Sequence, residues 1–278
     1  MSTAQMLGRC LVGAVILMTL STTARGAPSA DLWQRWAAHA PDSGTVVDHA
    51  AWDRFLTRYR STGPDGIARV AYKAVTPGDR IALDAYLAQL SSVSVSALNR
   101  PEQKAYWINL YNALTVNVVL QHYPVESIRD INISPGFFTS GPWKKQLIRV
   151  ENAALTLDDI EHRILRPGWG DPRVHYVLNC ASLGCPNLPA EALRRDNLEP
   201  MLEAAAVAFV NHPRGVRVEE GAVVASKIYS WFRDDFGADD EAVLAHLRGC
   251  ARGRLRDALS GARSIDRYSY DWALNDAP

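Results

Sequence analysis

Apolar residues in the first part of the chain recur at helical spacing. Residues 32–37, 52–59 and 79–90 each carry apolar side chains three or four positions apart. This spacing gathers apolar side chains on one face, so each segment is predicted to be an amphipathic helix packed on a core. Turn-forming residues at 61–66 separate the second helix from a short strand predicted at 68–72.

The stretch at residues 105–120 is apolar on every side, which predicts a central, buried helix. Asn99 or Arg100 caps it in this interpretation. Asn109 and Asn112 lie three positions apart and therefore share one face. A buried amide without hydrogen-bond partners costs about 1–3 kcal/mol. The two amides are thus expected either to tie down backbone in neighbouring loops or to support a site as orienting groups or oxyanion donors.

Reactive side chains are densest between residues 171 and 186. Residues 174–178 are predicted to form a short buried strand that carries His175, followed by a turn bracketed by Cys180 and Cys185. Two thiols and an imidazole so close in sequence make this stretch the predicted active site.

The preceding helix is predicted to start at Thr156, which begins a capping pattern. Glu161 falls within its apolar stripe, where a carboxylate is costly unless it is paired or hydrogen-bonded. Glu161 is therefore expected to meet an imidazole, an arginine or a backbone amide. His162, at the edge of the stripe, is a second candidate imidazole.

Further elements complete an α+β pattern. We predict strands at residues 143–150 and 264–272, a helix at 197–210 and a hairpin at 216–224. The predicted fold has helices packed on a mostly antiparallel sheet. Lys227, among aromatic residues at 226–236, either covers aromatic surface with its stem or binds an acidic substrate group.

The first 26 residues have the pattern of a cleaved signal peptide, with an apolar run at residues 11–20 that is too short for a stable membrane span. This predicts a periplasmic or secreted protein. The expected organisation is a signal peptide at 1–26, a helical region at 27–98, and a core with a C-terminal extension at 99–278 packed as one domain. Cys10 would leave with the signal, so Cys180, Cys185 and Cys250 would remain in an oxidising compartment.

Composition limits the partner class. The 278 residues contain 30 basic and 30 acidic side chains and are 47% hydrophobic. The balanced charge gives no indication of nucleic acid or of an anionic membrane surface. Composition leaves the identity of the partner open. No cofactor is expected.

Several motifs occur in order along the chain, at residues 106–114, 157–162, 174–186 and 226–236. Together they resemble the domain of unknown function 547 family, over residues 99–236. The resemblance implies an exported or plant-type domain with a papain-like or transglutaminase-like cysteine fold. It also implies action on glutathione-linked or peptide-like thiol substrates.

Three interpretations of the thiols stay open. In the first, Cys185 is a nucleophile served by His175 and Glu161, with Cys180 as resolving or structural partner. A helix expected just beyond Pro186 would favour its thiolate form. In the second, Cys180 and Cys185 form a structural disulfide. In the third, both thiols and His175 or His162 bind zinc.

The function hypotheses follow from these interpretations. The first is an exported thiol-dependent hydrolase or transferase that uses a Cys-His-Glu constellation. The second is a non-catalytic periplasmic binding module in which a Cys180–Cys185 disulfide is structural and the aromatic loop from Phe137 to Trp143 binds a partner.

Overall fold

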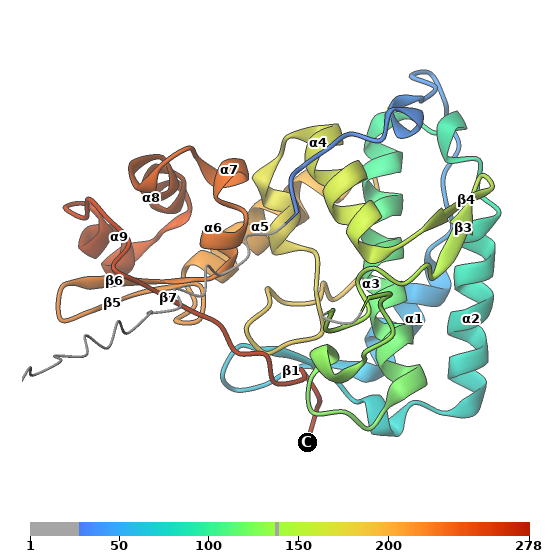
Figure 1. Cartoon of the computed structure of the whole chain (residues 1–278), viewed down its shortest axis with the longest axis horizontal. Coiled ribbons are helices and arrows are strands. Elements are labelled where there is room, and N and C mark those ends of the chain that lie inside the picture. The colour runs from blue at the N-terminus through green and yellow to red at the C-terminus, as the bar shows by residue number, and fades with distance from the viewer. Residues whose placement is uncertain (1–27, 137–138) are drawn as a thin grey trace, which may run out of the picture.

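The structure of the chain is a computed structural model that describes residues 28–136 and 139–278 (Figure 1). The predicted signal peptide lies outside the described residues, as do Phe137 and Phe138 of the aromatic loop. The α-helices are α1 (Ala50–Tyr59), α2 (Pro77–Ser91), α3 (Arg100–His122), α4 (Arg166–Trp169), α5 (Leu198–Val210), α6 (Ile228–Trp231), α7 (Arg233–Phe236), α8 (Asp240–Cys250) and α9 (Gly253–Leu259). The strands are β1 (Arg60–Thr62), β2 (Ala68–Val70), β3 (Ile148–Val150), β4 (Ala153–Leu155), β5 (Val216–Glu219), β6 (Ala222–Ser226) and β7 (Arg267–Ser269).

Helix α3 is the centre of the first hydrophobic core. Its side chains are buried almost all round from Glu102 to Leu120, as the sequence predicts. The Asn99 side chain accepts a hydrogen bond of 3.0 Å from the Glu102 N–H and so caps the helix. Helix α2 packs beside α3 and α1 packs on α2, with the β3–β4 hairpin also against α2 (Figure 1). An all-round apolar helix is thereby removed from water.

A second hydrophobic core lies beyond α5, around α6 to α9 and a three-stranded sheet (Figure 1). Strands β5 and β6 form the predicted antiparallel hairpin, and β7 adds to β6 in parallel. The two cores meet at residues 176–178, because Tyr176 packs in the second core while Val177 and Leu178 pack in the first. This seam brings side chains from both halves to one place.

The C-terminal segment crosses the seam. After β7 the chain runs back to the first core, where Ser182 pairs with Leu274 and Val70 with Asp276 through isolated β-bridges. The Ser127 hydroxyl also donates to the Trp272 carbonyl, at 2.7 Å. Residues far from the predicted active site in sequence are held against it in this way.

The α+β class is confirmed, but its sheet content is smaller than predicted. The described residues form two two-stranded sheets and one three-stranded sheet. The strands predicted at residues 143–150 and 264–272 shorten to β3 and β7.

The strand predicted at residues 174–178 is wrong. His175 instead lies in a 3₁₀-helix, η6 (Pro172–Tyr176). The Asp171 side chain accepts a hydrogen bond from the Arg173 N–H, and Pro172 fixes a helical φ at the first position. These two start signals override the β propensity of the following residues.

Asn109 and Asn112 each clamp a loop to α3. Asn109 donates to the Leu193 carbonyl (2.7 Å) and accepts from the Leu193 N–H (3.0 Å). Asn112 donates to the Val177 carbonyl (2.8 Å) and accepts from the Asn179 N–H (2.9 Å). Each amide hydrogen-bonds to backbone through both its nitrogen and its oxygen, which agrees with the first of the two predicted roles.

Replacing Asn112 with alanine is expected to destabilise the fold by at least about 2 kcal/mol. The change leaves one buried N–H and one buried carbonyl without a partner, and each such group costs about 1–3 kcal/mol. Urea unfolding followed by circular dichroism measures the loss. Asn117→Ala is the matched control, because Asn117 lies on the same helix and its bond to Asp84 is exposed. Equal stability of the two variants would contradict the clamp.

Candidate active site

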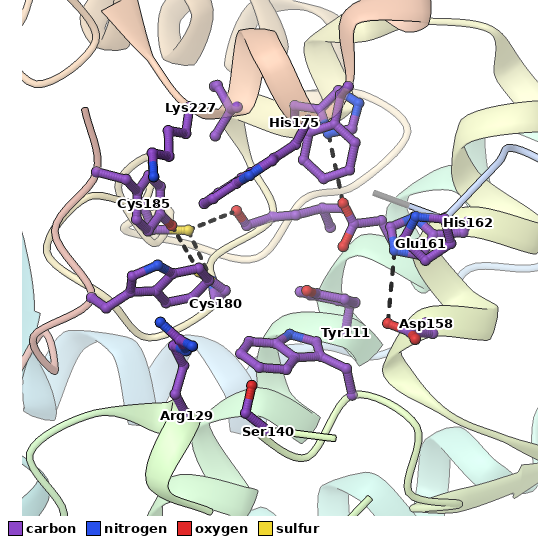
Figure 2. Close-up of a pocket in the computed structure, with 18 of the residues that line it drawn as sticks. Tyr111, Arg129, Ser140, Asp158, Glu161, His162, His175, Cys180, Cys185 and Lys227 are labelled. Carbon is purple, nitrogen blue, oxygen red and sulfur yellow. Dashed lines mark hydrogen bonds and ion pairs between the residues drawn. The ribbon is translucent and has the colours of Figure 1, made fainter. Parts of the chain in front are cut away.

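A cavity of about 640 Å³ opens at the seam between the two cores, around the predicted active site (Figure 2). Its walls combine thiol, imidazole and carboxyl groups with several aromatic rings. A concave site of this size, with few convergent polar groups, is typical of a small-molecule pocket. Among its lining residues are Tyr111, Arg129, Trp143, Lys144, Asp158, Glu161, His162, His175, Cys180, Cys185, Lys227, Trp231, Phe232, Tyr270 and Trp272.

The Cys180 thiol is half-buried and surrounded by hydroxyl groups. Its Sγ lies 3.2 Å from Ser182 Oγ and 3.0 Å from Tyr270 Oη. Hydrogen bonding with the Cys185 thiol, and then with these two hydroxyls, lowers the pKa of Cys180 below its ordinary value although burial opposes the change. The next residue, Ala181, is buried with φ 59°, a left-handed conformation that costs energy in a residue with a Cβ. Cys180 therefore precedes a strained residue, and its hydrogen bonds favour its thiolate.

Cys185 has the opposite environment. Its side chain is 4% exposed, and Sγ lies 3.6 Å from the Leu178 carbonyl and 3.0 Å from the Cys180 N–H, which donates to it. Burial, followed by the neighbouring Cys180, raises the pKa of Cys185 well above its ordinary value. The helix expected just beyond Pro186 is wrong, since the next helix is α5, beginning at Leu198. Cys185 consequently lacks the helix dipole that was expected to favour its thiolate.

The thiols of the described residues form no disulfide. Cys180, Cys185 and Cys250 are all free there, so the disulfide considered from the sequence is not formed between Cys180 and Cys185. The two side chains are nonetheless neighbours through the contact of the Cys180 N–H with the Cys185 sulfur.

Glu161 lies on a π-helix, η5 (Asp159–Leu165), that follows the predicted cap at Thr156. A π-helical turn is rare and is found frequently at functional sites. The Glu161 carboxyl is 8% exposed and lines the cavity. Burial raises its pKa to about 8, against the opposing effects of a hydrogen bond with Tyr111 and the positive charge of Arg166. Glu161 accordingly carries a proton at neutral pH.

His175 is held between two carboxyl groups. Its Nε2 lies 2.7 Å from Asp235 Oδ2. Its Nδ1 lies 3.7 Å from Glu161 Oε1 (Figure 2). The ring also stacks on Phe232, with centroids 4.1 Å apart. Burial lowers the pKa of His175 although Asp235 opposes it, so the ring is neutral and donates Nε2–H to Asp235. The free Nδ1 lone pair then faces Glu161.

Asp235 is anchored by a second partner. Arg166 donates to it from Nε (2.5 Å) and Nη2 (3.1 Å), a two-point contact that fixes the carboxylate plane. Despite the opposing effect of burial, hydrogen bonds from His175 and Arg166 lower the pKa of Asp235. The result is an ordered row of Arg166, Asp235, His175 and Glu161. Among the described residues neither thiol hydrogen-bonds to His175, so the Cys–His contact expected from the sequence is absent there.

His162 belongs to the wall of the site. Its Nδ1 accepts from Arg166 Nη1 at 3.2 Å, and its Nε2 lies 3.7 Å from Asp158 Oδ1. Burial, then the charge of Arg166, lowers the pKa of His162 to about 3. Both ring nitrogens of His162 therefore face side chains from the same helical region, those of Arg166 and Asp158. His175, in contrast, contacts Asp235 on α7.

Three residues of the site were not selected from the sequence. Asp235 stands in a motif that the family resemblance includes, but nothing local indicated that it would meet His175. Tyr270 reaches Cys180 only through the C-terminal crossing segment, 90 residues later in the sequence. Tyr111 shares the buried helix with the two asparagines. A polar tip on an all-round apolar helix is the signal that could have drawn attention to it.

Two further findings concern the described residues alone. In that part of the chain no three His, Cys, Asp or Glu side chains are grouped so that they could hold a metal ion. No helix there is both long enough and apolar enough to cross a membrane.

Comparison with known families agrees with the resemblance. Residues 95–210 match the model of a family described as "Protein of unknown function, DUF547". The matched range contains α3, Glu161, His175 and both thiols of the cavity, whereas Asp235 and Tyr270 lie beyond it. No curated protein and no solved structure matches the chain.

Proposed function

We propose that this chain, which carries a DUF547 domain over residues 95–210, is a thiol-dependent hydrolase or transferase for peptide-like or glutathione-linked acyl substrates. The observation that carries the proposal is the placement of Cys180. A half-buried thiol with a lowered pKa shares a 640 Å³ cavity with a protonated carboxyl group and an ordered histidine. Ionisable groups whose pKa values are shifted in opposite directions within one cavity are typical of catalytic sites.

Cys180 is the better nucleophile of the two thiols. The thiolate is the attacking species, and it forms most readily where hydroxyl donors stabilise the negative charge. Ser182 and Tyr270 supply such donors to Cys180. Cys185, which was the first choice from the sequence, is buried against a backbone carbonyl and supports the Cys180 turn instead.

The proposed reaction proceeds in two steps. In the first, the Cys180 sulfur bonds to the substrate carbonyl carbon, and the bond from that carbon to the leaving group breaks. Glu161 gives its proton to the leaving amine or thiol, which leaves a thioester on Cys180. In the second, water or an acceptor thiol attacks the thioester carbonyl. Glu161 takes back a proton, and the acid or transferred acyl product departs with release of the Cys180 thiolate.

His175 and Asp235 have positioning roles in this proposal. Asp235 fixes the tautomer and orientation of His175, whose Nδ1 faces the Glu161 carboxyl at 3.7 Å. Because the His175 imidazole is neutral, it places no positive charge beside Glu161. The Glu161 carboxyl therefore keeps its proton more readily.

We also propose a papain-like or transglutaminase-like fold and an exported location for the protein. A papain-like or transglutaminase-like arrangement is supported by the thiol, histidine and acid that share one cavity. It is opposed by the orientation of His175 toward Glu161 rather than toward a thiol. The signal-peptide pattern at residues 1–26 supports export to the periplasm or the medium.

Alkylation of the native protein tests the assignment of the nucleophile. Iodoacetamide at pH 7, followed by peptide mass spectrometry, is expected to modify Cys180 first, because its thiolate is the most accessible and the most stabilised. Cys185 and Cys250, both buried, are expected to react only after unfolding and serve as internal controls. Recovery of Cys180 and Cys185 as a disulfide with no reactive thiol would instead favour the binding-module alternative.

A further inference from the structure

Three positive side chains converge on the mouth of the Cys180 cavity from separate elements. Arg129 lies on the 3₁₀-helix η4 (Ile128–Asp130), Lys144 lies in the loop before β3, and Lys227 lies at the start of α6. All three line the cavity and all are exposed. In the view of Figure 2, Lys227 lies above the two thiols and Arg129 lies below them.

No described carboxylate forms a close ion pair with these three cations, although the charge of Lys144 acts on Asp158 and partly opposes the rise in the pKa of that carboxyl. Elsewhere the described residues contain many ion pairs, yet none of the three lies within 4.0 Å of a described carboxylate. Their side chains also make no hydrogen bond in that part of the chain, although Arg129 stacks over Trp272 at 5.3 Å. Unpaired cations gathered at a cavity raise the local concentration of anions.

The acids of the same cavity do not cancel this charge. Burial raises the pKa of Glu161 to about 8, so it is neutral at pH 7. Burial also raises the pKa of Asp158, to about 6, which leaves Asp158 the single acidic lining group that is mostly charged. Three positive charges therefore face one mostly ionised carboxylate and the Cys180 thiolate, so the lining keeps a net positive charge at neutral pH.

From this charge pattern we propose that the cavity selects acyl substrates that carry a negative group, such as a free carboxylate or a phosphate, near the reacting carbonyl. The selecting residues are Arg129, Lys144 and Lys227. Arginine offers a planar two-point contact to such groups, and the lysines act as point charges. Aromatic rings at Trp231 and Trp272 border the same space and suit the apolar part of the acyl chain. The inference rests on the proposed function, because it names the substrate class of that site.

Paired alkylating reagents measure the selection without a known substrate. Iodoacetate is an anion and iodoacetamide is neutral, and both modify the same thiolate. The ratio of their rates at Cys180 is expected to fall about fivefold in Lys144→Met/Lys227→Met, because the attraction for the anionic reagent weakens. Lys145→Met is the matched control, since Lys145 is exposed next to Lys144 but does not line the cavity. The iodoacetamide rate reports whether the double variant is folded and its thiol unchanged.

Two further experiments identify the preferred anion and test whether the cations select the substrate during turnover. Succinate or inorganic phosphate should slow iodoacetate more in the parent protein than in the double variant, and the stronger protector indicates the preferred group. With N-acetylcysteamine thioesters, the succinyl compound is expected to exceed its neutral methyl ester by about tenfold in kcat/KM, a preference that salt weakens.

The outcomes separate the two proposals. A reactive Cys180 with the same rate ratio in parent, control and double variant would overturn the inference and leave the proposed function standing. No reaction at Cys180 with either reagent contradicts the proposed function and, with it, the inference that depends on it. A lowered ratio in the double variant alone supports both.

Discussion

Cys180→Ser is expected to lower kcat/KM for a thioester or peptide-like substrate by on the order of 10³-fold or more, the loss typical of removing a nucleophile. Serine keeps the size of the side chain and can hydrogen-bond with Ser182 and Tyr270, so the turn is expected to remain folded. The serine hydroxyl is not ionised at neutral pH, and His175 is not placed to activate it. The measurement is steady-state turnover, with circular dichroism to confirm the fold.

Cys185→Ser is the matched control. Its oxygen can accept the Cys180 N–H in place of sulfur and can donate to the Leu178 carbonyl, so the turn keeps both contacts. A loss of no more than about tenfold is expected, because Cys185 only supports the nucleophile. The opposite order, with Cys185→Ser inactive and Cys180→Ser active, would return the role of nucleophile to Cys185.

The parts of this architecture that depend on local pattern were predicted from the sequence. The central helix follows from an apolar run on all its faces, and Glu161 falls within the stripe that buries it. Asn109 and Asn112 lie on one face of a helix, so their need for partners was also visible. In each case the spacing of apolar residues along the helix determines which side chains are buried.

The parts that depend on tertiary contact were not predictable. The choice between Cys180 and Cys185 depends on which sulfur meets hydroxyls, and Tyr270 reaches Cys180 only because the C-terminal segment crosses the seam. The contact of His175 with Asp235 spans 60 residues. Residues 174–178 have strand propensity, yet a local start signal at Asp171 and Pro172 prevails.

A second large effect is expected in the pH dependence of kcat/KM. Acylation requires Cys180 as thiolate and Glu161 with its proton, so the profile should be bell-shaped. Activity rises with pH through the lowered pKa of Cys180, below the ordinary thiol value of about 8.5. It falls as pH rises through the Glu161 pKa of about 8, because the ionised carboxylate has no proton to give. Rates with a thioester from pH 5 to pH 10 define both limbs.

Glu161→Gln isolates the falling limb. An amide neither gives nor takes the proton, so kcat/KM should drop by about 10²-fold and the decline above pH 8 should disappear. Asp158→Asn is the matched control, because Asp158 is the other acid lining the cavity and its pKa of about 6 lies well below that limb. A merely structural role for Glu161 predicts a lower rate with an unchanged profile. Persistence of the falling limb in Glu161→Gln would therefore assign it to a group other than Glu161.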